Sequence, residues 1–218
     1  MRDLINYLKN PVLNSSKAPR IKYFLFLFFI DFLAAFVFSF CISFIRKHFD
    51  INHIVLGLTR RDTILFGVIF APITEEVIFR SLLRFKKINI ILFIITLTAY
   101  VAIAAFHFKT LNVILALFIL ISFIILLTTI PTSKIESFIS SKFKYFFYGT
   151  SLIFGLLHIF NFTGNLYLML AFLIILTAPQ IVGGLILGYI RMNYGLVYSI
   201  LFHITGNGFI IILLSHNM

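Results

Sequence analysis

The sequence predicts an all-α protein, a polytopic transmembrane helical bundle. Apolar residues make up 61% of its 218 residues and charged residues only 11%, whereas a soluble domain carries about 25% charged residues. The mean hydropathy is +1.08, and the apolar residues form runs of the roughly 20 residues that a membrane-spanning helix needs. The chain lacks the polar surface of a water-soluble globule, so we expect one membrane-embedded domain over residues 1–218.

We expect about seven spans, within a range of six to eight. The third and fourth are separated by little more than Lys109 and Thr110, which predicts a tight hairpin. The sixth contains Pro179, which predicts a kink, a tilt or a re-entrant break. Residues 1–20 mix apolar and charged side chains and are expected to form an interfacial segment. The spans lie near 21–45, 63–84, 88–108, 110–131, 144–161, 165–190 and 194–214.

The chain carries 18 Lys and Arg against seven Asp and Glu, a formal net charge of +11. On a membrane protein such an excess is typical of cytoplasmic loops, and we expect no nucleic-acid partner. Twelve of these basic residues fall on the same side as the N-terminus and five on the other. This asymmetry predicts an integral protein of the plasma membrane whose N-terminus is cytoplasmic. The single Cys41 excludes a disulfide framework within the chain.

Ionisable residues interrupt the apolar run of the second predicted span. Glu75, Glu76 and Arg80 would each cost roughly 2.5–3.5 kcal/mol in a lipid-exposed helix, so they must face protein. Glu76 and Arg80 are four residues apart and share a helical face, so they are expected to form a supporting ion pair. Glu75 lies about 100° away from that face. It is the residue we expect to transfer a proton.

Two later spans carry histidines at helical spacing. His158 follows Phe154 by one turn in the fifth span, and His203 precedes Asn207 by one turn in the seventh. A lone intramembrane histidine more often joins two helices by a hydrogen bond. Three spans that each offer polar groups predict instead one interior site, formed by Glu75, His158, His203 and Asn207.

Other residues within the spans have simpler interpretations. Asp31, in the first span, is expected to make a buried hydrogen bond, and the alternative is that it lines the site. Gly155 and the pair Gly184-x-x-x-Gly188 allow two helices to approach closely. They predict a packing seam.

In this order on separate spans, the polar motifs resemble the CAAX-protease and bacteriocin-processing family, also called the Abi family, which includes type II CAAX prenyl endopeptidases. The resemblance covers the second span and the C-terminal third, including a stretch that ends at Arg191. It departs from many members because 83 residues and two extra predicted spans separate Glu75 from His158. The motifs are Glu75-Glu76-x-x-x-Arg80, Phe154-x-x-x-His158 and His203-x-x-x-Asn207.

The resemblance implies an intramembrane endopeptidase that acts on a membrane-associated peptide or protein, either prenylated at its C-terminus or of the bacteriocin or leader type. It implies that Glu75 and His158 position and deprotonate the attacking water. It further implies that His203 and Asn207 stabilise the oxyanion. A metal-dependent version would hold zinc on His158, His203 and Glu75. Because the chain has no His-Glu-x-x-His helix, its spacing does not decide for a metal.

Two other classes of function stay open at this point. Asp31, Glu75, Glu76 and the histidines would suit the proton relay of a small proton-coupled transporter, although the sequence shows no repeated halves. A non-catalytic membrane chaperone or immunity protein on the same scaffold is the other alternative. On each of these interpretations, as for the protease, the protein is embedded in the lipid bilayer of the membrane.

Overall fold

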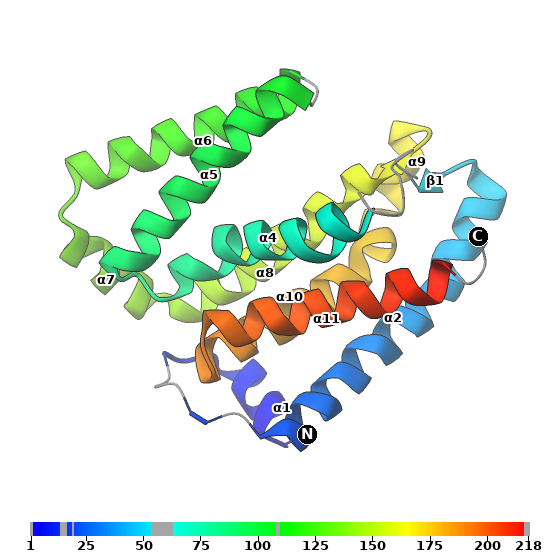
Figure 1. Ribbon diagram of the computed structural model, residues 1–218, viewed down its shortest axis with the longest axis horizontal. Helices are drawn as coiled ribbons and strands as arrows, with labels where there is room; N and C mark the ends of the chain where they lie inside the picture. Colours follow the sequence, from blue (N-terminus) through cyan, green and yellow to red (C-terminus); the bar gives the residue numbers. More distant parts are fainter. Residues whose placement is uncertain (1, 14–16, 19, 54–62, 108–109, 216–218) are drawn as a thin grey trace.

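The computed structural model describes residues 2–13, 17–18, 20–53, 63–107 and 110–215. Within them the regular structure is helical apart from one antiparallel pair of two-residue strands, so the predicted all-α class is confirmed. The elements are α1 (Arg2–Lys9), α2 (Ile21–Phe49), β1 (Asn52–His53), the π-helix η1 (Thr63–Phe70), α4 (Ala71–Arg80), the 3₁₀ turn η2 (Ser81–Leu83), α5 (Lys87–His107), α6 (Thr110–Thr129), α7 (Thr132–Ser141), α8 (Phe143–Leu157), the 3₁₀ turn η3 (His158–Asn161), β2 (Phe162–Thr163), α9 (Leu166–Ala171), α10 (Leu173–Asn193) and α11 (Leu196–Ser215) (Figure 1).

Three helices of the described part are long and apolar enough to cross a membrane: α2, α8 continued through η3, and α10. A fourth span results if α6 and α7 are counted as one, although the chain bends by 109° between them. Helices α5 and α11 contain shorter apolar stretches, Lys87–Ala102 and Leu196–Ile210. These helices support the predicted membrane protein, while the number of about seven spans stays a prediction.

The segment predicted as the sixth span, 165–190, is not one helix. The chain leaves helical geometry at Phe172, which separates α9 from α10, and the Phe172 ring packs 4.8 Å from that of Phe49 on α2. Pro179 lies inside α10 and does not end it. Apolar residues stand on both sides of Phe172, so hydropathy alone does not reveal the break. The predicted tight hairpin at Lys109 and residues 54–62, which separate the first two predicted spans, lie outside the described residues.

Helices α8 and α10 pack closely along a row of glycines. A Cβ atom on Gly155 would lie 2.7 Å from the backbone nitrogen of Ile181, and one on Gly184 would lie 2.9 Å from a backbone oxygen of α8. A Cβ on Gly188 would lie 2.7 Å from the Phe147 ring. The predicted packing seam is therefore confirmed, and it fixes the distance between α8 and α10.

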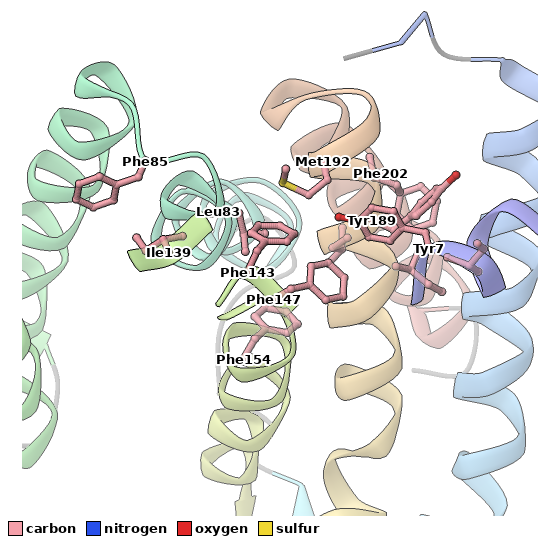
Figure 2. Packing of buried hydrophobic residues seen from close by; sticks show 14 of the residues in the cluster. Tyr7, Leu83, Phe85, Ile139, Phe143, Phe147, Phe154, Tyr189, Met192 and Phe202 are labelled. Carbon is pink, nitrogen blue, oxygen red and sulfur yellow. The ribbon is translucent and has the colours of Figure 1, made fainter. Parts of the chain in front are cut away.

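Aromatic side chains fill the space between α1, α8 and α10, as Figure 2 shows. The Tyr7 ring lies 5.6 Å from Phe147 and 5.2 Å from Tyr189, both in edge-to-face geometry. Leu4 of the same helix is also buried. Helix α1, part of the segment that was expected at the interface, thus packs against the bundle through its apolar face.

Helices α5 and α6 lie at one side of the molecule, with α5 beside α4 and α6 beside α5 (Figure 1). They correspond to the two extra predicted spans between Glu75 and His158. The chain then returns through α8, whose Phe154 ring lies 5.5 Å from Phe79 of α4. This pair of helices therefore does not separate the segments that carry the motifs.

We predict that Gly155→Ala destabilises the protein by about 1–3 kcal/mol, because its Cβ would meet the backbone of α10 and overpack the seam. Gly149→Ala on the same helix is the matched control, since its Cβ would meet nothing within 4 Å. Thermal unfolding in detergent should show a lower midpoint for Gly155→Ala and an unchanged or higher one for Gly149→Ala. Equal midpoints for the two variants would contradict the close packing of α8 on α10.

Candidate active site

Side chains from three helices meet beside α4. Glu75 belongs to α4, His158 stands where α8 ends, and His203 belongs to α11. The Oε2 atom of Glu75 lies 4.0 Å from Nε2 of His158 and 3.7 Å from Nε2 of His203. The three side chains are 30%, 18% and 11% exposed, respectively. The structure thus brings together one carboxylate and two imidazoles that remain partly accessible.

Both imidazole rings are oriented through their Nδ1 atoms. Nδ1 of His158 lies 2.8 Å from the carbonyl oxygen of Phe154, and Nδ1 of His203 lies 3.3 Å from Oε1 of Glu76. A carbonyl or carboxylate oxygen only accepts, so each Nδ1 donates and each Nε2 is left facing Glu75. The Phe154 ring lies 4.9 Å from the His158 ring and 5.9 Å from the His203 ring. The Phe-x-x-x-His spacing therefore supplies both a backbone acceptor and an aromatic support.

Glu76 is fully buried and is surrounded by partners. Its carboxylate accepts hydrogen bonds from His203 and from the Ser199 hydroxyl, and it lies 3.8 Å from Nε of Arg80. Arg80 is also fully buried, with its guanidinium carbon 4.6 Å from the centroid of the Phe154 ring. This distance is within the range of a cation–π interaction. The Glu76–Arg80 pair is thus a structural ion pair that also holds His203.

The end of α4 is held against the C-terminal end of α10. Nε of Arg191 donates to the carbonyl oxygen of Arg80 at 2.9 Å, and the Arg84 guanidinium donates to the carbonyl oxygen of Met192 at 2.7 Å. These bonds satisfy carbonyl groups at two helix ends that lack intrahelical partners. Arg191, the last residue of the stretch that adds to the family resemblance, therefore anchors α4 and lies outside the Glu75 group.

Asn207 makes a different contact from the one expected. It lies one turn beyond His203 on α11, and its Nδ2 donates to the carbonyl oxygen of Gly67 in η1 at 2.9 Å. The hydrogen bond recorded for this amide among the described residues is with Gly67, and not with Glu75 or with either histidine. Its second N–H stays on the same face of α11 as His203.

Three further residues lie near the site, and of these the sequence indicates only Asp31, as an alternative. Ser199 precedes His203 by one helical turn, a spacing that could have indicated its contact with Glu76. Asp31 of α2 approaches Gly183 of α10, where an added Cβ would lie 3.2 Å from its Oδ1, and it interacts electrostatically with His203. Tyr100 of α5 interacts electrostatically with Glu75. No local spacing connects Asp31 or Tyr100 to the motifs, since they come from other helices.

The donor types of the site fit zinc in part. Two Nε2 atoms face one carboxylate, and each Nδ1 is bonded to an oxygen, the outer hydrogen bond that zinc-binding histidines usually make. In the part of the chain that the structure describes, however, no group of three His, Cys, Asp or Glu side chains stands in a metal-binding arrangement. His158, His203 and Glu75 are the residues that would hold an ion.

The cluster defines a class of site, a glutamate–histidine group supported by a buried ion pair within apolar helices. Comparisons of the chain with protein-family models, with curated proteins and with solved structures found no match. The resemblance to CAAX-type proteases therefore depends on the motif residues of this chain alone.

We predict opposite consequences for the two adjacent glutamates. Glu76→Gln should lower the free energy of unfolding by about 3–5 kcal/mol, because it leaves the buried Arg80 without its counter-charge. Glu75→Gln should change it by less than about 1 kcal/mol, because the Glu75 side chain is 30% exposed. Thermal unfolding and limited proteolysis in detergent measure both effects. Equal loss of folded protein in the two variants would show that the glutamates do not have separate roles.

Proposed function

We propose that this protein is an intramembrane endopeptidase of the CAAX-protease type, whose single domain hydrolyses peptide bonds of membrane-associated substrates. The observation that carries the proposal is the meeting of Glu75, His158 and His203 from three apolar helices. Charged groups in apolar spans are costly and usually mark a functional site. A carboxylate beside imidazole groups is suited to activating water.

Glu75 and His158 are the proposed water-activating pair. Their closest atoms are 4.0 Å apart, too far for a direct hydrogen bond, so a water molecule that lies beside the pair would bond to both. The oxygen of that water attacks the carbonyl carbon of the scissile peptide, and its proton passes to Glu75. When the C–N bond breaks, the amine leaves with a proton that Glu75 returns. Because Nδ1 of His158 donates to Phe154, Nε2 accepts the second hydrogen of the water.

His203 and Asn207 are the proposed donors to the oxyanion of the tetrahedral intermediate. With Nδ1 of His203 bound to Glu76, its Nε2 lies on the Glu75 side, where the ring would donate through Nε2 when it carries a second proton. Asn207 has one amide hydrogen left after its bond to Gly67. Glu76, which is paired with Arg80, holds the His203 ring in place.

We further propose about seven spans, with the N-terminus in the cytoplasm and the protein in the plasma membrane. Lys17 donates from its backbone to the carbonyl oxygen of Asn193, and Arg84 donates to Met192 beside it. The basic N-terminal segment, the turn after α4 and the end of α10 therefore lie at one end of the bundle. Their shared basic character supports a cytoplasmic position for that end. The substrate class is a membrane-anchored peptide, prenylated or of the leader type.

We predict that Glu75→Ala and His158→Ala each reduce cleavage to background, and that the double variant is scarcely worse, because groups that act as a unit are strongly non-additive. The assay incubates purified protein with a library of membrane-anchored peptides, with and without a prenyl group, and detects products by mass spectrometry. Glu136→Ala and His48→Ala are matched controls, because both side chains are exposed and belong to α7 and α2.

Well-folded Glu75→Ala that still cleaves would remove Glu75 from the mechanism. A wild-type protein that cleaves no peptide but couples solute uptake to protons would favour a transporter instead.

We predict that cleavage survives metal chelation, because the proposed steps use the Glu75 carboxylate as the base and need no ion. A zinc ion, if bound there, would polarise the peptide carbonyl. Activity is measured after treatment with 1,10-phenanthroline and again after zinc is added back. Loss of activity that zinc restores would assign the ion to His158, His203 and Glu75.

A further inference from the structure

The segment before Glu75 is a π-helix that ends at Phe70, two residues before Pro72. Helix η1 runs from Thr63 to Phe70, and α4 follows without a break, with Pro72 in its first turn. Long π-helices are rare, and single π turns are frequent at functional sites. Glu75 stands only one turn beyond this junction, so the geometry of the junction decides where its carboxylate points.

Pro72 leaves one carbonyl group of η1 without its regular partner. In a π-helix the carbonyl oxygen of residue i accepts from the N–H of residue i+5. For Gly67 this residue is Pro72, which has no N–H. A carbonyl group inside the bundle needs another donor.

Asn207 supplies that donor from a different helix. Its Nδ2 lies 2.9 Å from the Gly67 oxygen. The next residue, Gly208, lets α11 approach η1 closely, since a Cβ there would lie 3.4 Å from the Val68 side chain. One turn earlier on α11, His203 reaches Glu75 and Glu76. Helix α11 therefore contacts this segment on both sides of the junction between η1 and α4. Asn207 contacts Gly67 before the junction, and His203 contacts the two glutamates after it.

We propose that Asn207 is a positioning residue that closes the hydrogen-bond ladder interrupted by Pro72 and so holds Glu75 in register with His203. This proposal depends on the proposed function, and it adds to it a role for Asn207 that acts through the backbone. This positioning role requires that the Asn207 amide donates to Gly67 and that residue 72 has no backbone N–H. Both conditions can be changed separately.

A double-mutant cycle between Asn207→Ala and Pro72→Ala tests the proposal. Asn207→Ala alone should lower kcat by about tenfold to a hundredfold with little change in KM, because it leaves the Gly67 carbonyl unpaired. Pro72→Ala restores an N–H five residues after Gly67. In that background the loss on Asn207→Ala should be smaller by at least about threefold. An equal loss in both backgrounds would overturn the proposal and leave the amide with a role in the reaction alone.

Hydrogen–deuterium exchange gives a second readout that does not depend on proteolysis. Asn207→Ala should speed the exchange of peptides from 63–80 relative to peptides from α8, whereas Thr205→Ala, an exposed change on the same helix, should not. This comparison holds even where Pro72→Ala fails to fold or the wild type cleaves nothing. Unchanged exchange over 63–80 in Asn207→Ala would overturn the proposal.

Discussion

The wholly buried carboxylate of Glu76 constrains the rest of the site. A charge taken out of water inside apolar helices must be matched by opposite charge and by hydrogen-bond donors. Glu76 obtains the charge from Arg80 one turn away and the donors from Ser199 and His203 of α11. Two contacts one turn apart on α11 fix how far that helix can slide along α4. Because one nitrogen of His203 is used by Glu76, the other is directed to Glu75.

The second constraint is how closely apolar helices can approach one another. In a membrane, lipid tails are as apolar as the side chains, so helices associate by packing and hydrogen bonds more than by the hydrophobic effect. Gly155, Gly184 and Gly188 meet this requirement between α8 and α10. Helix α8, held by this packing, places the Phe154 ring against Arg80. It also places His158, at its end, within reach of Glu75. The packing of α8 on α10 thus positions the His158 imidazole at the site, although the glycines themselves take no part in the chemistry.

Sequence alone predicts those features of the site that follow from the spacing of residues along one helix. The Glu76–Arg80 pair and the shared face of His203 and Asn207 follow from residues four apart, and the all-α class follows from apolar runs. Contacts between distant helices, such as that of Asn207 with Gly67, leave no local signal. The break at Phe172 and the π-helix η1 lie within continuous apolar sequence, where hydropathy is the same for every backbone geometry. Span boundaries were therefore less predictable than the motifs.

Adjacent positions on one helix can serve different purposes because their environments differ. Glu75 and Glu76 are chemically identical and about 100° apart around α4, yet one is 30% exposed and the other is fully buried. Every oxygen of Glu76 is already engaged, so a proton or substrate cannot reach it without breaking the ion pair with Arg80. Glu75 faces two imidazole nitrogens at distances longer than a hydrogen bond, which leaves its oxygen available to a third group. Burial thus gives Glu76 a structural role and leaves Glu75 for the proposed chemistry. The difference in burial arises because successive residues of a helix point about 100° apart.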